Sequence, residues 1–190
     1  GSEMCIRDRG QYTPLSVQTI NNLGIDCSGL VYYTLTQLGY STSGFSWNNP
    51  VPVDTDHWLT VNDNCTITYD GKTSKVEVEK KNIKTTDRPY WECADGSVIT
   101  AGSVVVAQNP GGEDHAWIYM GEFDSRNDVV SYLKSIGVSE SLINSKTVGD
   151  GTGAGGTHWR IESNGSEGVV INNKTDGKTA TACLLYTSDA

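Results

Sequence analysis

The chain has 190 residues, a length that fits one domain with a substantial hydrophobic core. Hydrophobic residues make up 36% and charged residues 19% of it, and its five Trp and nine Tyr exceed what a disordered chain carries. No apolar run is long enough to predict a membrane span. The formal net charge of -9 disfavours the phosphate backbone of a nucleic acid as a partner.

Both ends of the chain look foreign to this domain. Residues 1–9 and 183–190 lack the periodic apolar pattern of a core element, and they resemble adapter read-through in metagenomic gene fragments. We therefore expect a single domain over residues 10–182, with a non-native tail on either side.

Three of the five cysteines lie inside the expected domain: Cys27, Cys65 and Cys93. Because three is an odd number, at most one disulfide forms within it, and Cys65 with Cys93 is a candidate pair. The same two cysteines and His57 are a weak candidate for metal ligands, because the chain has no close Cys-x-x-Cys spacing. We predict no metal site and no cofactor.

The first predicted helix places a cysteine at its start. Asp26 is a suitable N-cap, apolar residues follow at helical spacing over 30–38, and Gly39 ends the pattern. Cys27 therefore falls at or next to the first helical position. The exposed N–H groups and the dipole of a helix N-terminus stabilise a thiolate, which is the nucleophilic form of cysteine.

A long loop and a hairpin are expected next. Residues 43–63 are rich in Asn, Pro, Trp and Ser, which is typical of a loop. The segments 65–69 and 75–79 flank Asp70-Gly71, a dipeptide that favours a tight hairpin turn.

The second half of the chain alternates between strands and one helix. Residues 99–106 and 116–120 predict two antiparallel strands, and Ser125 opens a short helix that Gly137 ends. A glycine-rich segment, 149–156, predicts a flexible loop with no nucleotide role, because it lacks the Lys and Ser/Thr of a phosphate loop.

Two further strands are expected at 159–163 and 169–171, which completes an α+β pattern.

A reactive thiol also needs an imidazole that the fold brings to it. The chain has three histidines: His57, His115 and His158. His115 is the best candidate for pairing with Cys27, because it begins a strand directly after a turn and so lies at an edge rather than deep in a core.

Three segments resemble the NlpC/P60 cysteine peptidases. Asp-Cys-Ser-Gly-Leu-Val at 26–31 looks like their nucleophile motif, and 99–106 resembles their Leu-x-Pro-Gly-Asp-Leu-Val strand. His-Ala-Trp-Ile-Tyr-Met-Gly at 115–121 resembles their His-Val-Gly-Ile-Tyr-Leu-Gly strand. The segments keep the family's order and cover under half of the chain. The resemblance implies a papain-like fold, here with insertions at about 44–97 and 122–157.

The family adds a third polar residue, on the strand after the one with the catalytic histidine. In the strand 158–163, alternation puts His158, Arg160 and Glu162 on one face. His158 and Glu162 lie roughly 13 Å apart along it, so only one of them can contact the imidazole. Glu162 is favoured, because Ile-Glu-Ser matches the family's apolar-polar-small tripeptide, and His158 is the alternative.

The resemblance implies that Cys27, His115 and this third residue hydrolyse amide bonds in peptidoglycan stem peptides, outside the cell or at the cell wall, in a monomer. It makes Asp26 and Tyr12 candidate substrate contacts, although the family's Gly-Gly pair after the Tyr is missing and Asp26 also caps the helix. Two alternatives stay open: a wall-binding module without catalysis, and a papain-like acyltransferase or amidase acting on another substrate.

Overall fold

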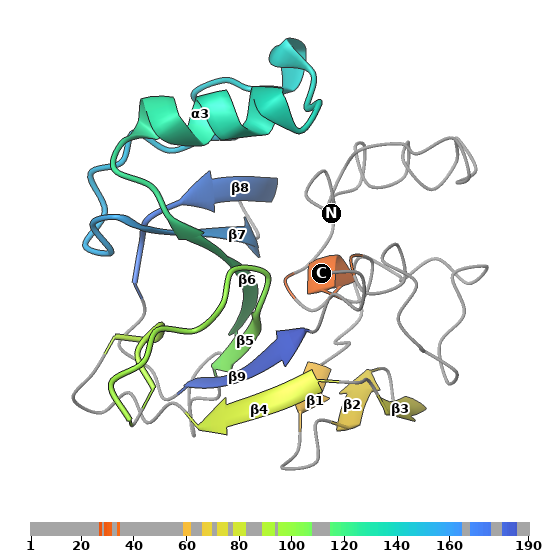
Figure 1. Ribbon diagram of the computed structural model, residues 1–190. Helices are drawn as coiled ribbons and strands as arrows, with labels where there is room; N and C mark the ends of the chain where they lie inside the picture. The colour runs from red at the N-terminus through yellow and green to blue at the C-terminus, as the bar shows by residue number, and fades with distance from the viewer. Residues whose placement is uncertain are drawn as a thin grey trace.

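The computed structural model describes residues 27, 29–31, 34, 59–61, 66–69, 72–75, 78–82, 89–93, 95–107, 115–164, 168–175 and 180–185. They form an α+β structure, as the sequence predicts, with a six-stranded sheet, a separate three-stranded sheet, and a helix over one end of the larger sheet (Figure 1). None of the helices in this described part combines the length and the apolar character needed to span a bilayer.

The six-stranded sheet is antiparallel at every pairing and has the order β4-β9-β5-β6-β7-β8. Its strands are β4 (Val78–Asn82), β9 (Ala180–Leu185), β5 (Val104–Ala107), β6 (His115–Glu122), β7 (His158–Asn164) and β8 (Gly168–Asn172). The predicted pairing of β5 with β6 is confirmed, but β5 begins later than expected. Ala101 and Gly102 form a turn instead, in which Gly102 has a φ of 91°, a left-handed conformation that favours glycine.

The smaller sheet consists of β1 (Leu59–Val61), β2 (Thr66–Tyr69) and β3 (Lys72–Lys75). The hairpin around Asp70-Gly71 is confirmed, because Tyr69 pairs with Lys72. Its second strand was predicted too late, since a two-residue turn makes the residues directly beside it pair. The later residues belong to β4, in the larger sheet, and β1 lies within the stretch that was expected to be a loop.

Strand β9 extends past residue 182, where the expected domain ends, and takes in 183–185 of the expected C-terminal tail, whereas 186–190 are not among the described residues. Residues 183–185 pair with β4, and Cys183 also pairs with Val104 of β5, so β9 lies between two other strands. The sequence pattern was misleading because backbone hydrogen bonds hold a strand in a sheet and need no periodic apolar side chains.

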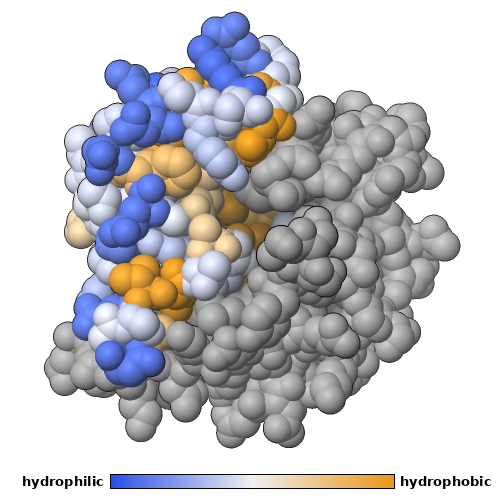
Figure 2. Space-filling view, in the orientation of Figure 1, coloured by the Kyte–Doolittle hydropathy of each residue, from blue (hydrophilic) through white to orange (hydrophobic). Residues whose placement is uncertain are grey.

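Helix α3 (Arg126–Ser135) has the ends that the sequence predicts. The Ser125 hydroxyl accepts from the backbone N–H of Asp128 at 3.2 Å. At the other end, the N–H groups of Gly137 and Val138 donate to the carbonyls of Lys134 and Leu133, which is a Schellman motif. A 3-10 turn, η2 (Glu140–Leu142), follows. Figure 2 shows mainly hydrophilic residues over the outer side of α3.

Side-chain alternation divides the core between the two faces of the larger sheet. One cluster joins the helical segment near Cys27, the strands and α3: Leu30, Val31, Val104, Val106, Ala116, Ile118, Val129, Leu133, Val148, Trp159, Ile161 and Ile171. The other cluster contains Tyr90, Cys93, Ile99, Val105, Ala107, Trp117 and Tyr119. Leu30 and Val31 are fully buried in the first cluster, so they fix the helical segment that carries Cys27.

The glycine-rich segment 149–156, which was predicted to be a flexible loop, forms hydrogen bonds with one buried side chain, that of Asn173. The amide nitrogen of Asn173 donates to the carbonyls of Gly151 and Gly156, and its amide oxygen accepts from the N–H of Gly153. A Cβ at Gly153 would lie 2.6 Å from Asn173, so this close approach needs glycine.

Candidate active site

The fold brings the predicted cysteine and histidine together. Cys27 is helical, half-buried and a free thiol, and its side chain hydrogen-bonds to His115. His115 is the first residue of β6, and its side chain keeps 20% of its surface exposed. The pair therefore lies at a strand end that solvent reaches, as a site for an external substrate requires.

Glu162 lies on the other side of the same imidazole. The register of β6 and β7 sets Glu162 opposite Trp117, and its Oε2 is 3.6 Å from Nε2 of His115. The Glu162 side chain is only 4% exposed. Because Nε2 faces this carboxylate, Nδ1 is the ring nitrogen left for the thiol. Cys27, His115 and Glu162 thus form a continuous row.

The surroundings of His115 favour its charged form. Burial lowers its pKa, but the hydrogen bonds and charges of Cys27 and Glu162 outweigh burial and raise the pKa from 6.5 to about 9. Burial raises the pKa of Glu162. The contact with His115 and the charge of Arg160 lower it by a larger amount, so the net shift is downward. At neutral pH the row therefore holds an imidazolium beside a carboxylate.

A buried arginine, Arg160, forms an ion pair with Glu162. Nε of Arg160 is 2.5 Å from Oε2 of Glu162, and the arginine side chain is 2% exposed. Its guanidinium lies over the ring of Trp117, 4.5 Å from the centroid, and 5.9 Å from the centroid of Tyr90. Asn172, on β8, also lowers the pKa of Glu162. Sequence reasoning put Arg160 on the face of Glu162 but missed its role, because the aromatic partners come from distant segments.

His158, the alternative third residue, lies at the opposite end of β6. It pairs with Glu122, seven positions beyond His115, which corresponds to about 20 Å of strand. Its Nε2 is 3.2 Å from a carboxylate oxygen of Glu122, so Nδ1 accepts from the Tyr119 hydroxyl at 2.7 Å. Its ring stacks on Trp91 at 4.0 Å between centroids. The structure does not bring His158 to His115.

The sequence also singled out Tyr12, Asp26, His57, Cys65 and Cys93. Tyr12, Asp26, His57 and Cys65 lie outside the described residues. Cys93 is buried in the second core cluster, and the candidate disulfide with Cys65 stays a prediction because Cys65 is not among the described residues.

No protein-family model, curated protein or solved structure matches this chain. The site is therefore described by its chemistry alone: a thiol in a helical segment, an imidazole that hydrogen-bonds to it, and a buried carboxylate on the other side of the imidazole.

Proposed function

We propose that the protein is a papain-like cysteine peptidase of the NlpC/P60 type that hydrolyses amide bonds in peptidoglycan stem peptides. The observation that carries the proposal is the hydrogen bond between Cys27 and His115, on whose far side Glu162 lies. The substrate class rests on the resemblance of 26–31, 99–106 and 115–121 to that family. We also propose that it acts as a monomer outside the cell or at the wall.

In the proposed reaction the Cys27 sulfur attacks the amide carbonyl carbon while His115 holds the thiol proton. The backbone N–H of Cys27, in the helical segment, helps to stabilise the oxyanion. His115 then passes the proton to the leaving amine, which leaves a thioester on Cys27. Water activated by His115 hydrolyses the thioester and restores the thiol.

Glu162 and Arg160 prepare His115 for both proton transfers. The carboxylate lies 3.6 Å from Nε2 and attracts the proton on this nitrogen, which leaves Nδ1 for the sulfur. Burial would otherwise favour a protonated, neutral Glu162, and the adjacent guanidinium keeps it ionised. Arg160 is thus a positioning residue that acts through Glu162.

The direct test is the Cys27→Ala variant on purified peptidoglycan. Release of muropeptide fragments should stop while the variant stays folded at the assay temperature, because the half-buried thiol contributes little to the core. Cys27→Ser, which keeps the size and the hydrogen bond, should be almost as inactive. Fragment release by Cys27→Ala at the wild-type rate would refute the proposal, and wall binding by the wild type without cleavage would favour a binding module.

A further inference from the structure

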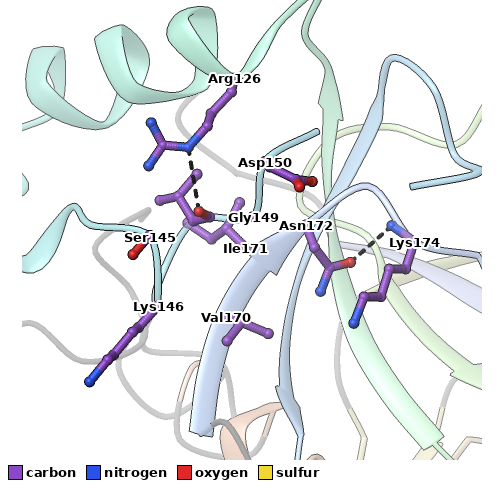
Figure 3. A pocket seen from close by; sticks show the side chains of 10 residues that line it. Arg126, Ser145, Lys146, Gly149, Asp150, Val170, Ile171, Asn172 and Lys174 are labelled. Carbon is purple, nitrogen blue, oxygen red and sulfur yellow. Dashed lines mark hydrogen bonds between the residues drawn. The ribbon is translucent and has the colours of Figure 1, made fainter. Parts of the chain in front are cut away.

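A cavity lies where β8 meets the segment between α3 and β7 (Figure 3). Its volume is about 750 Å³, within the range of small-molecule sites. Val148, Val170 and Ile171 supply buried apolar surface, and neither Cys27 nor His115 lines it. The cavity is therefore distinct from the proposed catalytic row.

Positive charge gathers around this cavity. Of the five cationic side chains that the structure describes, three line it, whereas only one of the eight acidic side chains does. The three cations are Arg126, Lys146 and Lys174. Within the described part of the chain none of them forms an ion pair. The net charge of the chain is -9, so this grouping makes the cavity a locally positive region of a negatively charged protein.

The one acidic lining residue does not cancel this charge. Asp150 directs its Oδ1 to Thr152, accepting from the backbone N–H at 3.0 Å and from the hydroxyl at 2.7 Å. These bonds, with a smaller contribution from the charge of Arg126, lower its pKa. With three cations and one anion, the formal charge of the lining is 3 minus 1, or +2.

Backbone hydrogen bonds already hold the walls in place. The N–H of Gly149 donates to the carbonyl of Ile171, and the N–H of Ile171 donates to the carbonyl of Thr147, both at 2.8 Å. Nε of Arg126 donates to the carbonyl of Val148 at 3.4 Å. Among the described residues no acceptor contacts the terminal nitrogens of Arg126, and an arginine can bind an oxyanion through two parallel hydrogen bonds from its guanidinium. A preformed site loses little ordering entropy when a ligand binds.

We propose that this cavity binds an anionic ligand that carries a carboxylate or phosphate group next to an apolar portion. The acid group binds the Arg126 guanidinium, Lys146 and Lys174 add positive charge from other parts of the lining, and the apolar portion contacts Val148 and Ile171. The site does not depend on the proposed peptidase reaction, because its charged residues take no part in that chemistry.

Binding is measured in the Cys27→Ala protein, by NMR titration of the backbone amides with inorganic phosphate and with butyrate. We expect saturable shifts centred on residues 145–150 and 170–174, and an affinity that falls as NaCl is raised. Arg126→Gln and the double variant Lys146→Gln/Lys174→Gln should each weaken binding at least tenfold. The probe that binds more tightly identifies the acid group of the ligand.

Lys134→Gln is the matched control, since Lys134 lies on the same helix, outside the cavity, and pairs with Glu140 at 3.3 Å. It should bind both probes like the parent protein. Absence of saturable binding for both probes, or equal affinity in Arg126→Gln and Lys134→Gln, would overturn the site. Because the protein tested lacks the Cys27 thiol, neither result bears on the peptidase proposal.

Discussion

Replacing Arg160 with methionine should destabilise the protein strongly, because it removes the nearer of the two cations beside the buried Glu162 and leaves only His115, at 3.6 Å. The guanidinium is 2% exposed and the carboxylate 4% exposed, so water cannot replace the lost partner. Breaking a buried ion pair by removing one member costs about 3–5 kcal/mol. For a chain of this size we expect the melting temperature to fall by roughly 10 °C.

The same reasoning predicts that a second substitution restores much of this loss. In Arg160→Met/Glu162→Gln the buried carboxylate is gone, and a neutral amide of similar shape faces a methionine that still contacts Trp117 and Tyr90. We expect the double variant to recover at least about 2 kcal/mol relative to Arg160→Met, because replacing both ions is far less costly than removing one.

The assay is urea denaturation at pH 7 of the wild type, both single variants and the double variant, which form a double-mutant cycle. Arg126→Met is the control, because Arg126 is only half-buried and forms no ion pair within the described residues; it should cost less than about 1 kcal/mol. If Arg160→Met costs no more than this control, or if the two substitutions are simply additive, the proposed support of Glu162 by Arg160 is wrong.

Two other predictions concern the histidines. The pKa of His115 is about 9 in the folded chain against 6.5 ordinarily, so protonation stabilises the fold below pH 6.5 and this gain, roughly 3 kcal/mol, is lost as the pH rises through 9. Urea denaturation from pH 6 to 10 should show the decline in the wild type and not in His115→Gln; parallel curves would contradict the ion pair. His158→Gln should lose about 1–2 kcal/mol of stability, with the Tyr119 bond and the Trp91 stack, while kcat/KM changes less than threefold. A hundredfold fall in kcat/KM without unfolding would instead place His158 in the reaction.

Local sequence patterns predicted the elements whose signals lie within a few residues. The ends of α3 follow from Ser125 and Gly137, and the hairpin of β2 and β3 follows from Asp70-Gly71. Strand β9 could not be found this way, because its place between β4 and β5 depends on partners far away along the chain. The exact start of β5 was missed for a local reason, since the turn at Gly102 interrupts an apolar run that reads as one strand.

The site was predictable in part. Alternation along β7 put His158 and Glu162 on one face and showed that only one of them can contact the imidazole. Which end of β7 lies beside His115 depends on the register with β6, which sets Glu162 opposite Trp117. The contribution of Arg160 arises from Tyr90 and Trp117, which meet only in the folded chain. The catalytic roles themselves stay predictions.

The most direct test of the central claim is the pH dependence of Cys27 alkylation by iodoacetamide, followed by mass spectrometry of the peptide that carries Cys27. A thiol that shares its proton with His115 should be alkylated much faster at pH 6.5 than the same thiol without this partner. In His115→Ala the rate at pH 6.5 should fall at least tenfold. Equal alkylation rates for the wild type and His115→Ala at every pH would contradict the account.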